Sequence, residues 1–305
     1  MSEPVKRLGI VVAVDGSPAS YGAAFWAARD AAMRNIPLTV VHAVATPTAT
    51  WPPVPYPESL AVRLEDEGKK AIIHAMKIAD DAMPAGRKVA VGRELVYSSP
   101  ALALIKMSDE AEMIVVGTSG RRVLARGVLG SVSSTVVRHA SCPVAVIRDD
   151  ELPDPQDPVL VGIDGSPVSE LATAIAFDEA SRRGVDLIAL YAWSDVAASE
   201  LELDWVVVEP EAQRSLAESL AGWQERYPDV TVHRLVVCDR PAKQLVEKSQ
   251  SAQLVVVGSH GRGGLTGMLL GSVSNAVLHS VRVPVIVARQ PSVPGKPTVT
   301  GDAGR

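Results

Sequence analysis

The chain has 305 residues, of which 47% are hydrophobic and 21% charged, and its formal net charge is −5. The apolar fraction excludes a disordered polyelectrolyte, and the acidic balance argues against a protein that binds nucleic acid through a basic face. Cys142 and Cys238 lie far apart and form no CxxC pair, which argues against a disulfide scaffold or a zinc cluster. At roughly 150 residues per domain, the length predicts two domains.

The first half alternates short valine-rich runs with helical patterns. The apolar run after Gly9 is too short to cross a membrane and no signal-peptide cleavage pattern follows it, so we expect a cytoplasmic protein without membrane insertion. Ser17 and Pro18 predict the start of a helix over Ala19–Arg34, and a second helix is predicted over Glu58–Ala82. The predicted strands are Leu8–Val14, Leu38–Val44, Lys88–Val96, Met113–Val116 and Val144–Ile147.

The second half repeats this order. Val-Asp-Gly-Ser-Pro at 14–18 recurs as Ile-Asp-Gly-Ser-Pro at 163–167, and residues 117–148 align without gaps to 258–289. Ser166 and Pro167 open a matching helix, and Glu209–Arg226 is the counterpart of the long second helix. The predicted strands are Val159–Ile163, Leu187–Trp193, Val230–Val237, Leu254–Val257 and Val285–Val287.

Strand–helix alternation predicts the fold class, because it requires right-handed crossovers and a parallel sheet. We expect an α/β protein with two tandem doubly wound domains, each a five-stranded, Rossmann-like parallel sheet flanked by helices. Such sheets bind ligands beyond the carboxyl ends of their strands. The expected organisation is a first domain over 1–148, a Pro- and acid-rich linker over 149–158, a second domain over 159–290 and a disordered tail over 291–305.

A glycine spacing after the fourth strand of each half is the strongest chemical signal. Glycine lets the backbone approach a phosphate closely, and the N-terminus of the following helix supplies free N–H groups and a positive dipole. The pattern G-x2-G-x9-G-S therefore predicts an anion cradle in each half. Its residues are Gly117, Gly120, Gly130 and Ser131, and then Gly258, Gly261, Gly271 and Ser272.

A structural alternative stays open at this point. The glycines could simply end strands and turn the chain, and duplication alone could preserve such a turn. The pattern is not a Walker A loop, because no lysine precedes Ser131 or Ser272, and neither half carries GxGxxG after its first strand. Asp15 and Asp164 likewise have two interpretations, as ligand contacts at a strand end or as residues that cap the next helix.

With these motifs, the chain resembles a tandem universal stress protein of the ATP-binding branch, with the resemblance covering roughly 6–148 and 158–289. The resemblance implies that the glycine loop holds the triphosphate, that the aspartate after the first strand contacts the ribose or metal side, and that backbone at the end of the second strand contacts adenine. ATP, with Mg²⁺, is the implied cofactor. The resemblance also implies a homodimer and a role in regulating stress response, growth or dormancy, through conformation and a regulatory protein partner.

Two sets of binding residues follow from the resemblance, and no catalytic residue or protein metal ligand is assigned. The first set is Ala13, Val14, Asp15, Ala43, Val116, Gly117, Thr118, Ser119, Gly120, Gly130, Ser131, Val132 and Ser133. The second set is Gly162, Ile163, Asp164, Ala192, Val257, Gly258, Ser259, His260, Gly261, Gly271, Ser272, Val273 and Ser274.

The two loops differ in one place. Arg122 and Val123 stand where the second half has Gly263 and Gly264, so we expect the second site to bind more tightly, unless arginines of the first loop pair with phosphate oxygens. The segments Ala45–Pro57 and Ser194–Pro210 are predicted to be irregular loops that cover a base, contact a partner or simply pack on the surface.

Two other functions remain open on the sequence. One is an enzyme, a slow ATPase or a nucleotidyl-transfer enzyme of the same superfamily, although the chain lacks an SGGxDS-type loop and extra acidic residues for metal. The other is a scaffold that binds no nucleotide. The resemblance further implies that the last strands of the two halves, Val144–Ile147 and Val285–Val287, pair across a pseudo-twofold axis.

Overall fold

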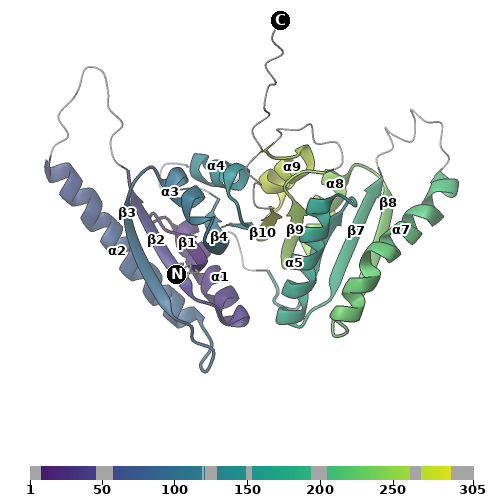
Figure 1. Cartoon of the computed structure of the whole chain (residues 1–305), viewed down its shortest axis with the longest axis horizontal. Coiled ribbons are helices and arrows are strands. Elements are labelled where there is room, and N and C mark those ends of the chain that lie inside the picture. Colours follow the sequence, from purple (N-terminus) through teal and green to yellow (C-terminus); the bar gives the residue numbers. More distant parts are fainter. Residues whose placement is uncertain are drawn as a thin grey trace, which may run out of the picture.

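The computed structural model describes residues 8–45, 58–118, 120, 129–148, 153–193, 205–261 and 269–289. These residues form one ten-stranded sheet with the order β3-β2-β1-β4-β5-β10-β9-β6-β7-β8, flanked by helices (Figure 1). Within each half all neighbouring strands are parallel, which confirms the predicted fold class. Strands β5 and β10 pair antiparallel, with Val285 opposite Val146, and form the seam between the two halves. The predicted pairing of the terminal strands is therefore also confirmed.

The first half runs from β1 to β5 in the order that the sequence predicts. The third strand starts and ends slightly later than predicted, and a short helix follows it. The elements are β1 (Gly9–Ala13), α1 (Pro18–Arg34), β2 (Leu38–Val44), α2 (Glu58–Ala82), β3 (Val91–Tyr97), α3 (Pro100–Met107), β4 (Ala111–Gly117), α4 (Ser131–His139) and β5 (Val144–Ile147).

The second half repeats the same order. Its elements, labelled as in Figure 1, are β6 (Val159–Ile163), α5 (Pro167–Arg183), β7 (Leu187–Trp193), α7 (Trp205–Arg226), β8 (Val232–Cys238), α8 (Pro241–Lys248), the 3₁₀ turn η1 (Ser249–Ser251), β9 (Leu254–Gly258), α9 (Ser272–Ser280) and β10 (Val285–Ala288).

The prediction for the second long helix was wrong at its start. We expected an irregular segment up to Pro210, but α7 already begins at Trp205 and contains Pro210. Proline lacks the N–H that an interior helical residue donates, so its presence predicts a boundary. In the structure the helix nevertheless continues past Pro210. The other segments predicted as loops, residues 46–57 and 194–204, lie outside the described residues.

Capping explains why α1 and α5 begin where they do. The Ser17 hydroxyl accepts a hydrogen bond from the Ser20 N–H, and Ser166 does the same for Ser169, with a proline at the first helical position in each case. Both helices end on a left-handed residue, Asn35 with φ 53° and Gly184 with φ 66°. The two helix starts predicted from Ser-Pro are therefore confirmed.

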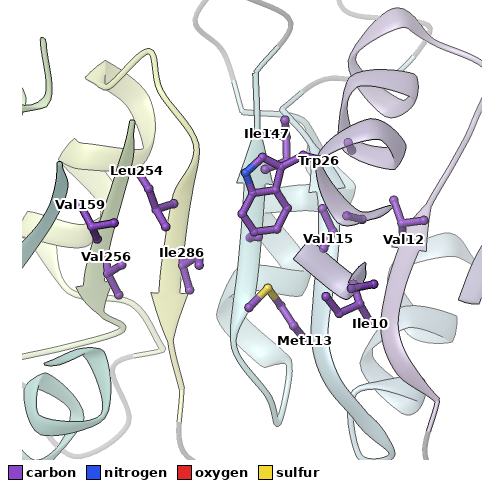
Figure 2. Packing of buried hydrophobic residues seen from close by; sticks show 14 of the residues in the cluster. Ile10, Val12, Trp26, Met113, Val115, Ile147, Val159, Leu254, Val256 and Ile286 are labelled. Atoms are coloured by element: carbon purple, nitrogen blue, oxygen red, sulfur yellow. The ribbon is translucent and has the colours of Figure 1, made fainter. Parts of the chain in front are cut away.

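The sheet separates two apolar layers. One layer packs α1, α2, α5 and α7 against one face, and the other packs α3, α4, α8 and α9 against the opposite face. Both layers contain residues of both halves, and Figure 2 shows Trp26 of α1 beside Ile147 of β5, close to the seam. The halves therefore share continuous cores, and the side chains are mostly valine, leucine, isoleucine and alanine, as the low aromatic content predicts.

A buried charge cluster joins α1 and α5. Asp30 and Glu179 occupy matching positions of the repeat and both are fully buried. Arg34 donates from Nε to Asp30 Oδ2 (2.7 Å) and from Nη2 to Glu179, while Arg183 donates from Nε to Glu179 Oε2 (2.9 Å). Arg183 Nη2 lies 3.5 Å from Asp30 Oδ1, so Glu179 receives the closer pair of arginine contacts.

The pKa values of the Asp30 and Glu179 carboxyls are shifted in opposite directions. Burial, together with the charge of Glu179, raises the pKa of Asp30 to about 7. Burial also acts to raise the pKa of Glu179, but Arg183 and Arg34 outweigh it and hold that pKa below its usual range. The cluster therefore holds one strongly ionised carboxylate and one that takes up a proton easily.

Candidate functional site

The aspartate after the first strand of each half stabilises a tight turn. Gly16 and Gly165 adopt φ 85° and 77°, a region that favours glycine. Ser17 donates to Asp15 Oδ1 from its backbone N–H (3.0 Å) and its hydroxyl (2.6 Å), and the Ser166 N–H donates to Asp164 Oδ1 (2.9 Å). One oxygen of each carboxylate thus holds the start of α1 or α5, as the capping interpretation expects.

The other carboxylate oxygen faces the glycine loop. A Cβ added to Gly120 would lie 2.6 Å from Asp15 Oδ2, and one added to Gly261 would lie 2.2 Å from Asp164 Oδ2. Only glycine fits without displacing the carboxylate. The structure therefore brings together two features that are distant in the sequence, the aspartate and the second glycine of the motif, and does so in both halves.

The first glycine of the motif has a packing role. A Cβ on Gly117 would lie 2.8 Å from the backbone carbonyl carbon and oxygen of Ala19, the second residue of α1. At Gly258 the nearest atoms are a methyl group of Val168, at 3.2 Å, and the His260 carbonyl oxygen, at 3.3 Å. Part of the glycine pattern therefore serves the close approach of helix to strand, as the structural alternative predicts.

Identical hydrogen bonds fix both loops to the sheet. The Gly130 N–H donates to the Thr118 carbonyl (2.6 Å), and the Gly271 N–H donates to the Ser259 carbonyl (2.7 Å). The Ser133 hydroxyl donates to the Gly117 carbonyl (2.6 Å), and Ser274 donates to Gly258 (2.5 Å). These bonds hold the N-termini of α4 and α9 over the ends of β4 and β9.

Each of these helix starts can accept an anion. Ser131 and Ser272 are exposed, and the first turns of α4 and α9 contain no acidic residue. The first N–H groups of a helix have no partner within the helix and lie at the positive end of its dipole. The geometry therefore presents N–H groups and a hydroxyl to a negatively charged group at this edge of the sheet.

A cavity of about 460 Å³ opens beside the first cradle. It brings together nearly all the residues predicted for the first site, with the exception of Thr118 and of Ser119, which lies outside the described residues. The predicted residues that line it are Ala13, Val14, Asp15, Ala43, Val116, Gly117, Gly120, Gly130, Ser131, Val132 and Ser133.

The sequence interpretation missed the side of the cavity that α2 forms. Leu64 and Glu67 of α2 line it together with His42 of β2. The Val14 carbonyl oxygen lies 2.7 Å from His42 Nδ1 and can only accept, so Nδ1 carries a proton. The ring lies against Gly68, where a Cβ would be 2.5 Å from Cδ2. Alternation along β2, which directs His42 and Val44 to one face, was the available signal.

The second half keeps the cradle but changes this neighbouring wall. Tyr191 and Trp193 occupy the positions of His42 and Val44 in the repeat. Trp193 Nε1 is buried and has no hydrogen-bond partner among the described residues. Helices α2 and α7 can be aligned by their buried residues, which pair Ala71, Ala75 and Ala79 with Ala212, Leu216 and Leu220. This alignment places Glu209 at the position of Gly68.

The remaining second-site residues follow the same order as in the first. Gly162 and Ile163 end β6 before Asp164, Ala192 lies in β7, and Val257 and Gly258 are the last two residues of β9. Ser259 is buried and His260 exposed, with the Ser259 hydroxyl 3.0 Å from His260 Nδ1. Val273 and Ser274 form the first turn of α9.

Several other residues singled out in the sequence can now be placed. Arg122, Val123, Gly263 and Gly264 lie outside the described residues. Within the described part of the chain, no group of three or more His, Cys, Asp or Glu side chains could hold a metal ion, and none of the described helices is long and apolar enough to cross a membrane. Burial raises the pKa of the Cys142 thiol to about 12, and Cys238 is half-buried.

Comparison with known proteins identifies the family. A family model described as "Universal stress protein family" matches residues 9–148 and 156–289. The universal stress protein Rv2005c of Mycobacterium tuberculosis is 68% identical, over 95% of this chain and all of the relative. Rv2623 of the same species is 52% identical over 95% of this chain and 99% of the relative.

The solved structures show the same fold. A crystal structure of a universal stress protein from Archaeoglobus fulgidus superposes with a TM-score of 0.70 and 19% identity, covering 93% of this chain and 97% of that one. The duplicated Asp-Gly-Ser-Pro turn, the duplicated glycine loop and the two matched segments lead to one conclusion. The chain belongs to the universal stress protein family, with two tandem Usp domains.

Proposed function

We propose that this protein binds ATP, with Mg²⁺, in both halves and acts as a nucleotide-dependent regulator of stress response and growth. The observation that carries the proposal is the cavity beside the first cradle, which joins an anion-binding helix start to a largely apolar wall. A polyphosphate fits the cradle and an aromatic base fits the wall. About four hydrogen bonds to charged phosphate oxygens, each worth about 1.5–3 kcal/mol, suffice for micromolar affinity after ordering costs.

The carboxylates beside the loops fit a role on the metal side of the ligand. Asp15 Oδ2 and Asp164 Oδ2 face the glycine loops, and their Oδ1 atoms are held by the following turns. Carboxylate oxygen is a ligand type that Mg²⁺ uses together with phosphate oxygens. These two residues are our candidates for holding the cation of a bound ATP–Mg²⁺ complex.

We propose regulation rather than turnover. Backbone N–H groups stabilise the ground-state triphosphate and the transition state alike, and such uniform binding does not raise the rate. Fast phosphoryl transfer also needs a positioned nucleophile and an additional cation. The described residues that line the cavity include His42, Asp15 and Glu67 as titratable groups, and the first two are engaged with the backbone. ATP then acts as a ligand that stabilises the bound conformation.

Extraction of nucleotide from freshly purified protein tests the function. Chromatography of the extract should show ATP, and a steady-state phosphate-release assay should give turnover far below about 10 per second, the enzyme median. Turnover of many per second that is lost in Asp15→Ala or Asp164→Ala would instead establish an enzyme. A protein that neither carries nor binds ATP would support the nucleotide-free scaffold.

We also propose that the protein is cytoplasmic and that two chains form a homodimer. Strands β3 and β8 end the ten-stranded sheet, and an edge strand offers unpaired backbone groups to a partner. Light scattering should give about twice the mass of one chain, 32.1 kDa. A monomer at all concentrations would contradict this part of the proposal.

A further inference from the structure

Two arginines occupy matching positions at the ends of the seam strands. Arg148 follows β5 and Arg289 follows β10, and each belongs to the part of its half that aligns without gaps to the other half. Both side chains are half-buried. Burial lowers the pKa of Arg289 from its usual range, but a guanidinium stays charged in proteins. Each half thus places a fixed cation at the seam.

Each of these arginines contacts a helix of the other half whose N-terminus forms a cradle, α4 or α9. Arg289 donates from Nη1 to the Val137 carbonyl (2.6 Å) and from Nε to the Ala140 carbonyl (2.7 Å), at the C-terminus of α4. Arg148 donates from Nη2 to the Leu278 carbonyl (2.8 Å) of α9, the position that matches Val137. Figure 1 shows α4 and α9 flanking the seam. The exchange is therefore reciprocal.

These helices are the ones whose N-termini form the cradles. The last carbonyls of a helix have no intrahelical partner and lie at its negative end, so a guanidinium there satisfies them and fixes the helix in place. Helix α4 has nine residues and is about 14 Å long, so its C-terminal cation does not touch a ligand at Ser131. Arg289 therefore acts on the first cradle through the position of α4.

Arg289 also contacts the chain that leads into the second cradle, and the matching position of the first half, residue 128, lies outside the described residues. Arg289 Nη1 donates to the Leu269 carbonyl (3.0 Å), two residues before Gly271 in the second cradle. One guanidinium thus holds the helix of the first cradle and the chain that leads into the second. A shift of either loop would therefore alter the hydrogen bonds that Arg289 makes to the other.

We propose that Arg148 and Arg289 are positioning residues supplied across the seam, so that each ATP cradle is completed by the other half, with Arg289 linking the two cradles. This inference rests on the proposed ATP binding. It predicts that substitution of the arginine in one half weakens ATP binding to the site in the other half. A substitution that only loosens local packing would not produce this pattern.

Titration of the full chain with ATP and Mg²⁺ tests the first site in isolation. Gly261→Glu is used to block the second site. In this background Arg289→Gln should weaken ATP binding about five- to tenfold. Arg182→Gln is the matched control, because Arg182 also crosses between the halves, donating to the Met33 carbonyl of α1 (3.1 Å), but contacts no cradle helix. It should change the affinity less than about twofold.

The reciprocal background completes the test. With Gly120→Glu blocking the first site, Arg148→Gln and Arg289→Gln should both weaken binding to the second, the latter through Leu269. Arg289→Lys keeps the positive charge and should therefore retain more affinity for ATP than Arg289→Gln. This comparison distinguishes loss of the cation from a general folding defect. Thermal melts of all variants provide the fold control.

Two results would overturn the inference while leaving the proposed function intact. One is first-site affinity unchanged by both substitutions at Arg289, and the other is an equal loss from Arg182→Gln and Arg289→Gln. Absence of ATP binding to the unsubstituted protein would overturn the proposed function itself, and the inference with it.

Discussion

The two halves share a cradle but differ in the wall beside it. Both hold an aspartate against the second loop glycine, and both fasten the helix start with the same hydrogen bonds. Beside the cradle, the first half has His42, Val44 and Gly68, with His42 packed on Gly68. The second half has Tyr191, Trp193 and Glu209 at the matching positions. The two halves thus share the cradle that we propose for the phosphates and differ in the wall that we propose for the rest of the nucleotide.

The charge cluster gives the largest expected difference between the halves. Glu179→Gln removes the carboxylate that Arg34 and Arg183 both contact. Arg34 keeps Asp30 and Asp178 as partners. Arg183, however, keeps only the longer carboxylate contact, to Asp30 (3.5 Å), so the free energy of unfolding at neutral pH should fall by about 3 kcal/mol. Asp30→Asn replaces a carboxyl that already takes up a proton near pH 7 and should cost clearly less. Denaturant unfolding of the two variants at pH 7 measures this, and equal losses would contradict the assigned asymmetry.

The same pair predicts opposite pH dependences. Because Asp30 has a raised pKa when folded, the folded state holds its proton longer, and its contribution to stability falls as pH rises from about 4 to about 7. Glu179 has a lowered pKa, so its contribution is present above its ordinary pKa and is lost as pH falls below it. Asp30→Asn should therefore remove the decline between pH 5 and 7, seen in urea unfolding at each pH. A decline of the same size in Asp30→Asn would contradict this account.

The first glycine of the motif gives the next largest difference. Gly117→Ala forces a Cβ to within 2.8 Å of the Ala19 backbone, which cannot move without shifting α1, and should cost about 2–3 kcal/mol. At Gly258 the nearest atoms are a Val168 methyl group at 3.2 Å and the His260 carbonyl oxygen at 3.3 Å, which need to move only by a few tenths of an ångström. Gly258→Ala should therefore cost less, about 1 kcal/mol. Thermal unfolding of the two variants provides the measurement. A larger loss from Gly258→Ala would reverse the comparison.

Gly68→Ala tests the wall that distinguishes the first half. The new Cβ would lie 2.5 Å from His42 Cδ2 and displace the ring. ATP binding to the first site, measured with Gly261→Glu in place, should weaken about fivefold, and binding to the second site should not change. Gly222→Ala is the matched control in α7, because a Cβ there meets nothing within 4 Å. It should add about 0.5–1 kcal/mol of stability without affecting binding.

The cysteines give the smallest effect. Cys142 is 6% exposed and burial raises its pKa to about 12, so it should resist iodoacetamide at pH 8 in the folded protein. Cys238 is half-buried at the end of β8 and should be alkylated first. Peptide mass spectrometry distinguishes the two. Modification of Cys142 at the rate of Cys238 would show that the core of the first half opens more easily than its packing indicates.

The sequence predicted the elements that depend on local chemistry. Ser-Pro helix starts, valine-rich strands and the glycine spacing are all encoded within a few residues. It failed at Pro210, which predicts a helix boundary but lies inside α7. It also missed Leu64, Glu67 and His42 as cavity residues, because their meeting depends on how α2 crosses β2. The contacts that cross the seam at Arg289 depend in the same way on tertiary geometry that no short pattern records.

The most direct test of the central claim is calorimetric titration of the full chain with ATP and Mg²⁺. The unsubstituted protein should bind two equivalents, and Gly120→Glu and Gly261→Glu should each leave one, because glutamate brings bulk and negative charge against both the aspartate and the phosphates. We expect the site that remains in Gly120→Glu to be the tighter one, because Gly263 and Gly264 stand where the first half has Arg122 and Val123. Unchanged ATP binding by the doubly substituted chain would contradict the assignment of both cradles.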